Sequence, residues 1–250
     1  MQGDMFYLTP AAGKRLIAFG IAAMDEIRDA VLNRSVLIVS GTTNAFVAEE
    51  LLRLIGEEKG FDARAFRRGF VAPRWAKVDD RLFNGDVLIR EGKWIRGREV
   101  SELAGELREG DVLFKGANAV NLREHEAGVL IGNPQGGTMM PVVAATIGRR
   151  VRLMVPVGVE KRVESRISEL AAMANAPGMK GLRLCSVPGE VYTELDAIRT
   201  LTGLDAQLLA AGGVNGAEGG AYFAARGDQD EIDCLHELVE RIEMEPSTIM

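Results

Sequence analysis

Residues 35–44 read SVLIVSGTTN, and this stretch decides the fold. The apolar residues from Val36 to Val39 do not alternate with polar ones, which is typical of a strand covered on both faces. Gly41 ends the strand, and apolar residues then recur at helical spacing, at Val47, Leu51, Leu54 and Ile55. A strand, a turn and a helix in this order indicate one unit of an α/β sheet.

Similar short apolar runs lie on both sides of this unit. Before it, Thr9 and Pro10 form a helix-start signal, and apolar residues follow at helical spacing as far as Val31. After it, strands are predicted at residues 63–71, 87–89, 94–95, 112–115, 128–131 and 151–155, and helices at residues 140–147 and 163–173. The alternation predicts an α/β fold with a mostly parallel sheet and helices on both faces, decorated by a hairpin at residues 87–95.

The pattern changes around Ala176, Pro177 and Gly178. Beyond them, strands are predicted at residues 182–187, 207–211 and 221–225, and helices at residues 192–201 and 232–242. We therefore predict an α/β ligand-binding core over residues 1–178 and a small α+β subdomain over residues 179–250. The glycine-rich segment 212–220 joins the last two strands and is longer than a tight hairpin turn requires.

The charge of the chain limits its partners. Its 250 residues include 36 acidic and 30 basic side chains, for a formal charge of −6, which disfavours a generally cationic nucleic-acid binder. Basic and aromatic residues do interleave from Arg64 to Lys77, but we interpret them as a solvated edge strand or an interface. No nucleic-acid partner is predicted.

Cysteine and apolar patterning indicate the compartment. Cys185 and Cys234 are the two cysteines, and neither lies in a CxxC pair, so neither a disulfide framework nor a structural zinc site is predicted. Both thiols are expected to be buried. No apolar run approaches the roughly 20 residues needed to cross a bilayer, and the first residues lack the pattern of a signal peptide. We expect a soluble cytoplasmic protein with no membrane partner.

Polar residues gather in four loops, residues 41–44, 116–121, 132–138 and 156–162, each of which follows a predicted strand. In an open parallel sheet, ligands bind at the carboxyl ends of the strands, where helix N-termini present free N–H groups. The alternative is four ordinary turns with threonine caps. The loops predict a site for an anionic, polyhydroxylated ligand, formed by Gly41, Thr42, Thr43, Asn44, Lys115, Gly116, Asn118, Asn121, Asn133, Gly136, Gly137, Thr138 and Lys161.

No cofactor or metal is predicted. Residues 41–44 match neither the GxGxxG dinucleotide fingerprint nor the P-loop. The chain holds two histidines, His125 and His236, too few for a histidine-rich metal centre. We interpret His236 as a surface or interface residue and His125 as part of a solvated charged face.

Three motifs carry a resemblance to a known superfamily. Residues 40–47 (SGTTNAFV), 111–118 (DVLFKGAN) and 133–138 (NPQGGT) resemble segments of the superfamily that holds ribose-5-phosphate isomerase, methylthioribose-1-phosphate isomerase, glucosamine-6-phosphate deaminase, sugar-sensing repressor domains and the CoA transferases. The first looks like the phosphate loop of ribose-5-phosphate isomerase, and the second is similar to a shared Gly-Ala-Asp segment. The third resembles the Asn and Gly-Thr positions of the methylthioribose-phosphate branch. The resemblance covers residues 11–165, and the tail is similar to a lid-like domain.

The resemblance implies binding of a small phosphorylated metabolite or a CoA-type ligand, with isomerase or transferase chemistry. Asn118 stands where the isomerases place an aspartate, and an amide cannot take a proton at neutral pH. Glu218 and Glu124 are the candidate acid/base residues. The alternative is a non-catalytic metabolite sensor, which Asn118 favours. Apolar hairpin edges at residues 87–95 predict a homodimer.

Overall fold

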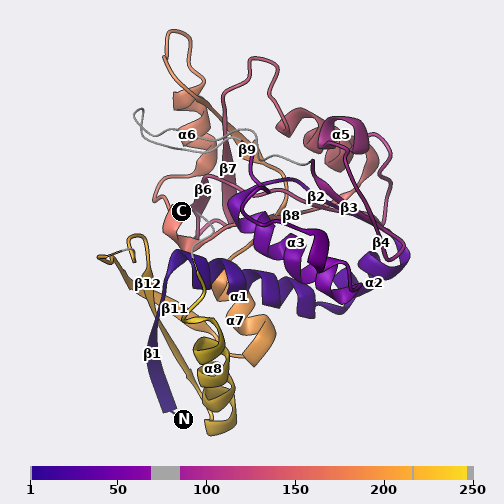
Figure 1. The fold of residues 1–250 in the computed structure, drawn as a ribbon. Coiled ribbons are helices and arrows are strands. Elements are labelled where there is room, and N and C mark those ends of the chain that lie inside the picture. The colour runs from indigo at the N-terminus through magenta and orange to yellow at the C-terminus, as the bar shows by residue number, and fades with distance from the viewer. Residues whose placement is uncertain (1, 69–84, 216, 247–250) are drawn as a thin grey trace.

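The computed structural model describes residues 2–68, 85–215 and 217–246, arranged around a central six-stranded sheet (Figure 1). Its order is β10-β8-β5-β2-β3-β4. The first four are parallel to one another, and β3 and β4 form an antiparallel hairpin on β2. The strands are β2 (Ser35–Ile38), β3 (Val87–Arg90), β4 (Lys93–Ile95), β5 (Val112–Phe114), β8 (Arg152–Pro156) and β10 (Glu190–Tyr192). The mixed α/β fold and the decorating hairpin are confirmed, and a dimer through the β4 edge stays a prediction.

Helices cover both faces of this sheet. They are α1 (Pro10–Ala23), α2 (Asp25–Asn33), α3 (Thr42–Leu54), α4 (Val100–Leu103) and α5 (Met139–Arg149). Val36 and Ile38 pack in one core with α1 and α3, while Leu37 between them packs in a second core with α4 and α5. Successive residues of a strand point to opposite faces, so an unbroken apolar run serves both layers.

A second, three-stranded antiparallel sheet stands beside the first. It consists of β6 (Ala119–Asn121), β7 (Glu126–Ile131) and β9 (Arg183–Val187), and α6 (Ile167–Ala174) packs against it. β7 contains the apolar run at residues 128–131. This run therefore does not belong to the parallel sheet, because the chain turns back after β6 through His125, which has a left-handed backbone with φ 51°.

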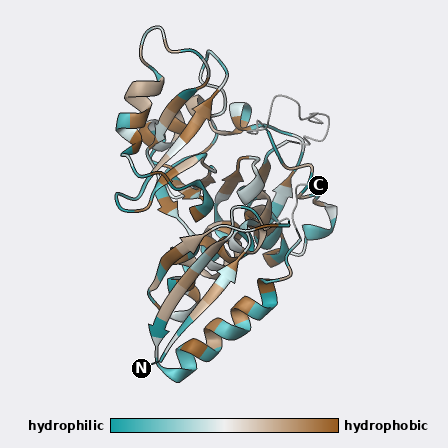
Figure 2. Ribbon diagram, turned by 90° about the vertical axis from the view of Figure 1, so that its left-hand side faces the viewer, coloured by the Kyte–Doolittle hydropathy of each residue, from teal (hydrophilic) through white to brown (hydrophobic). Residues whose placement is uncertain are grey.

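The third sheet brings the two ends of the chain together. β1 (Gln2–Leu8) pairs antiparallel with β12 (Ala221–Gly227), which also pairs with β11 (Ala206–Ala211). α7 (Glu194–Thr202) and α8 (Gln229–Ile242) begin with capping boxes, and Figure 2 shows hydrophobic and hydrophilic residues alternating along α8. β1 was not predicted. Elements from both sides of residue 178 share this sheet, and β10 extends the central one.

Several local predictions are wrong. The helix expected from Pro10 to Val31 is divided at Met24, whose extended backbone separates α1 from α2. Residues 63–68 form turns instead of a strand, since the Asp62 carboxylate accepts a hydrogen bond from the Arg64 N–H. Residues 69–71 of that predicted strand, and most of the basic and aromatic stretch, lie outside the described residues. Cys185 is half-buried and Cys234 exposed, so neither is a core thiol.

Within the described residues, no helix is long and apolar enough to cross a lipid bilayer.

Close packing of α1 on α7 gives a stability prediction. A Cβ on Gly20 would lie 3.0 Å from the Ala197 Cα and would overlap the Tyr192 hydroxyl, so Gly20→Ala forces the two helices apart. We expect it to lower the free energy of unfolding by about 1–3 kcal/mol. A Cβ on Gly148 of α5 meets nothing within 4 Å. Gly148→Ala is therefore the control and should raise stability by about 0.5–1 kcal/mol. Equal effects of the two changes on urea denaturation would contradict the packing described.

Candidate functional site

A pocket of about 650 Å³ opens beside the carboxyl end of β5. The segment after β5, the strand β7 and the N-terminus of α5 form its walls. Its lining is mixed, and we call its apolar part the apolar wall: Val100, Val129, Leu130, Ile131, Met140, Pro141 and Leu182. Six of the predicted ligand-binding residues line it: Lys115, Asn118, Asn133, Gly136, Gly137 and Thr138.

Lys115 supplies positive charge to this pocket. It follows β5 directly, its backbone N–H donates to the Met154 carbonyl, and its Nζ lies 3.4 Å from the Gly116 carbonyl oxygen. Burial lowers the pKa of Lys115 to about 8. The nearby Asp86 carboxylate opposes this shift, and the cations of Lys161 and Arg68 add to it. The ammonium is therefore a poorly solvated charge that an anionic ligand would stabilise.

Asn118 offers a free hydrogen-bond donor to the same pocket. Its Oδ1 accepts from the Leu130 N–H at 2.9 Å, which fixes the side chain against β7. Among the described residues, Asn118 Nδ2 has no hydrogen-bond partner. The amide N–H₂ is therefore available to a ligand oxygen.

The turn before α5 forms the third side of the pocket. Asn133 Oδ1 accepts from the Gln135 N–H at 2.7 Å, and this contact starts the turn. Gly136 and Gly137 follow with φ of 81° and 54°, left-handed values that favour glycine. Thr138 is the N-cap of the eleven-residue helix α5. The Gly136 and Met139 N–H groups donate to the Asn133 and Gly136 carbonyls, which leaves the N–H groups of Gly137 and Thr138 for a ligand at the pocket edge. Such N–H groups and the helix dipole favour an anion.

Arg68 and Glu99 also line the pocket, and sequence reasoning did not place either there. Their side chains form an ion pair at 2.9 Å. A further missed residue, Asp86, is 2% exposed and accepts hydrogen bonds from the Ser40 and Val100 N–H groups at 2.8 and 2.6 Å. Burial raises the pKa of Asp86. A single aspartate before a strand has no distinguishing pattern, so its contact with two distant segments was not predictable.

The other predicted residues lie outside this pocket. Lys161 Nζ is 3.5 Å from the Thr43 hydroxyl oxygen and 4.0 Å from the Glu160 carboxylate, which also pairs with Lys14 at 3.9 Å. Burial lowers the pKa of Lys161. We call Lys14, Glu160, Lys161 and Glu194 the edge cluster.

Glu194 is the fully buried member of the edge cluster. It is 2% exposed, and its Oε2 accepts from the Val159 N–H at 2.9 Å. Burial raises the pKa of Glu194 to about 8, and the negative charge of Glu160 adds to the shift. In this part of the structure, Glu160 Oε2 is itself buried without a hydrogen-bond partner. The edge cluster therefore contains two poorly solvated carboxyl groups, those of Glu160 and Glu194.

Several predicted ligand groups are used by the fold itself. Asn44 Nδ2 donates to the carbonyls of Val39 and Phe114 at 2.7 and 3.2 Å, which braces β2 against β5. Gly41 is the N-cap residue of α3, and Thr42 starts that helix. The Asn121 side chain makes four hydrogen bonds to backbone groups, two as donor and two as acceptor.

The two predicted acid/base residues do not line the pocket. Glu124 pairs with Arg166 at 3.4 Å in the turn between β6 and β7. Glu218 is exposed in the loop at residues 212–220, near the edge cluster, since a Cβ on Gly219 would lie 3.8 Å from the Glu160 Cβ. Proton transfer by either residue in this pocket therefore has no geometric support.

Comparisons of the chain with protein-family models, curated proteins and solved structures found no match. Among the residues that the structure describes, no three His, Cys, Asp or Glu side chains are grouped so as to hold a metal ion. The geometry of the pocket is therefore the evidence on which its function is proposed.

Proposed function

We propose that the protein binds a small phosphorylated or otherwise anionic metabolite in the pocket beside β5. One observation carries this proposal: the Lys115 ammonium, the free amide of Asn118 and the turn at residues 136–138 line the same pocket. These groups come from two segments, the one that follows β5 and the turn before α5, and all favour negative charge or hydrogen-bond acceptors. The volume of about 650 Å³ is within the usual range for small-molecule sites.

The apolar wall indicates that the ligand is more than an anion. Leu182 is 51% exposed and Met140 is 46% exposed at this wall, so a bound molecule would remove their surface from water. A sugar phosphate, a nucleotide or a CoA-type ligand each combines an anionic group with a less polar body. Isomerase or transferase chemistry on such a ligand is part of the proposal.

A non-catalytic metabolite sensor is the second candidate. Among the described residues that line the pocket, Glu99 is the one carboxylate and is ion-paired with Arg68, and Asn118 cannot accept a proton. A thermal-shift screen with sugar phosphates, nucleotides and acyl-CoAs, followed by product analysis, separates the candidates. Stabilisation without turnover supports the sensor, and turnover of the stabilising compound supports the enzyme.

Lys115→Met tests the binding proposal itself. It removes the ammonium but keeps an unbranched apolar side chain, so we expect a phosphorylated ligand to bind about 1.5–3 kcal/mol more weakly, the value of a charge-assisted hydrogen bond. Isothermal titration calorimetry with the best compound of the screen measures the change. Lys93→Met is the matched control, because Lys93 is exposed on β4 and does not line the pocket. Unchanged affinity in Lys115→Met would show that Lys115 does not contribute to ligand binding.

A further inference from the structure

Lys115 combines two properties that a simple anion-binding lysine does not need. Among the described lysines, it alone lines the pocket. Its Nζ forms no ion pair with any carboxylate of the described residues, and it lies 3.4 Å from the Gly116 carbonyl oxygen. Lys161, a half-buried lysine near it, is ion-paired with Glu160 and lies outside the pocket. An unpaired amine at the wall of a ligand pocket is a candidate nucleophile.

We propose that Lys115 condenses with the carbonyl group of an anionic ligand, an oxo acid or a phosphorylated aldehyde or ketone, to form an imine. The proposal rests on the proposed function, because the anionic group of the ligand would occupy the other binding groups described above, Asn118 and the turn at residues 136–138, while its carbonyl carbon meets Lys115. It goes further by assigning to the ligand a reactive carbonyl carbon and to Lys115 a covalent role.

The charges around Lys115 favour its reactive, unprotonated form. Burial lowers its pKa to about 8, and the cations of Lys161 and Arg68 act in the same direction against the opposing carboxylate of Asp86. About a tenth of the Lys115 side chains are then neutral at pH 7, against fewer than about one in a thousand for an ordinary lysine. Desolvation and neighbouring cations are the means by which proteins activate lysine amines.

The other walls of the pocket can hold the rest of such a ligand. Asn118 Nδ2 and the N–H groups of Gly137 and Thr138 can receive its carboxylate or phosphate, and the apolar wall can contact its less polar part. In the reaction, the lone pair of the neutral amine forms a C–N bond and the carbonyl C–O bond breaks. The two amine protons leave with the carbonyl oxygen as water, so a neutral amine and a carbonyl become an imine and one water, and one proton taken up from solvent gives the protonated imine.

Reductive trapping of the wild-type protein tests this proposal. Pyruvate or dihydroxyacetone phosphate is added with sodium cyanoborohydride, which reduces an imine to a stable secondary amine, and modified lysines are located by peptide mass spectrometry. Lactate and glycerol 3-phosphate, which lack the carbonyl, are the matched ligands. With the better of the two carbonyl compounds, we expect Lys115 to be modified at least about tenfold faster than the exposed Lys93 and Lys180. In Lys115→Arg, incorporation should fall to the level of the exposed lysines.

Thermal shift on the same four compounds separates this proposal from the binding proposal. Selective modification of Lys115 supports both. Stabilisation by the carbonyl compound and its matched ligand, with Lys115 modified no faster than Lys93, would overturn the imine and leave anion binding intact. No stabilisation by any of the four, together with no selective modification, would overturn the imine and count against the binding proposal.

Discussion

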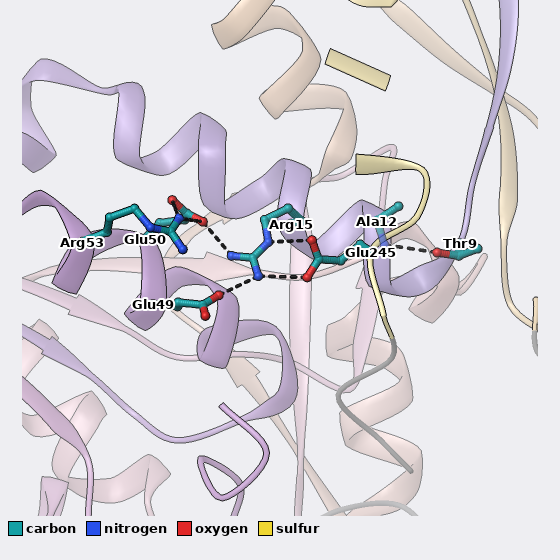
Figure 3. Close-up of polar contacts among 7 residues, drawn as sticks. All are labelled: Thr9, Ala12, Arg15, Glu49, Glu50, Arg53 and Glu245. Atoms are coloured by element: carbon teal, nitrogen blue, oxygen red, sulfur yellow. Dashed lines mark hydrogen bonds and ion pairs between the residues drawn. The ribbon is translucent and has the colours of Figure 1, made fainter. Parts of the chain in front are cut away.

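Arg15→Ala is expected to lower the free energy of unfolding by about 3–5 kcal/mol, because it breaks a buried ion network and leaves its carboxylates uncompensated. Figure 3 shows the Arg15 guanidinium among Glu49, Glu50 and Glu245. Arg15 and Glu50 are 9% and 7% exposed. Burial acts to lower the pKa of Arg15, but the hydrogen bonds that Arg15 donates to the carboxylates of Glu245 and Glu49 outweigh it and raise the pKa above its ordinary value.

The same guanidinium connects three segments. It lies on α1, pairs with two glutamates of α3, and makes a two-pronged contact with Glu245 beyond α8 at 3.0 and 2.9 Å. It also stacks 4.7 Å above the Phe46 ring. Removing it therefore costs packing between α1 and α3 as well as charge compensation.

Urea denaturation at neutral pH measures this effect. Arg53→Ala is the control, because the Arg53 side chain is 49% exposed and pairs with Glu50 at the edge of the network. A half-exposed pair of this kind is worth at most about 1 kcal/mol. Equal losses of stability in the two variants would show that Arg15 is not the buried centre of the ion network in Figure 3.

Glu194→Gln is expected to remove a pH-dependent loss of stability. The folded-state pKa of Glu194 is about 8, raised by burial and by Glu160 from an ordinary value of 4.5. A carboxyl group with a raised pKa binds more protons in the folded than in the unfolded protein between these two pH values. Its contribution to stability is therefore complete below pH 4.5 and is lost as the pH rises through 8.

The variant has no proton to lose, and an amide oxygen can still accept from the Val159 N–H. We expect the free energy of unfolding of Glu194→Gln, relative to that of the wild type, to increase by about 2 kcal/mol or more as the pH rises from 5 to 9. Denaturant titrations across this range measure the difference. Glu237→Gln, on the exposed face of α8, is the control and should show no such trend. A constant difference between wild type and Glu194→Gln would mean that Glu194 is ionised in the folded protein.

The central sheet was predictable because its strands are short apolar runs bounded by polar or glycine residues. Val36, Leu37 and Ile38 need no polar face, and this absence of alternation indicated helices on both sides. The run at residues 128–131 looks the same in sequence but lies in an antiparallel sheet. An apolar run indicates that a strand is buried. Which strand it pairs with depends on the neighbouring turns, such as the one at His125. β1 was missed because its partner, β12, is more than 200 residues away in the chain.

The candidate site was predictable where a loop follows a strand, as for Lys115 and Asn118. The site was not predictable where neighbouring side chains of one loop contact different parts of the fold. The Thr43 hydroxyl contacts Lys161, whereas the Asn44 amide donates a hydrogen bond to the Val39 carbonyl. Asp86 and Glu194 were missed because their importance comes from burial. No spacing rule reports the burial of a single acidic residue.

A crystal structure grown with the best phosphorylated compound of the thermal-shift screen tests the central claim most directly. The account predicts its phosphate within hydrogen-bond distance of Lys115 Nζ, Asn118 Nδ2 and the N–H groups of Gly137 and Thr138, with the rest of the molecule over Met140 and Leu182. A phosphate bound instead at residues 41–44 beside Lys161, or at another surface with the pocket empty, would contradict it.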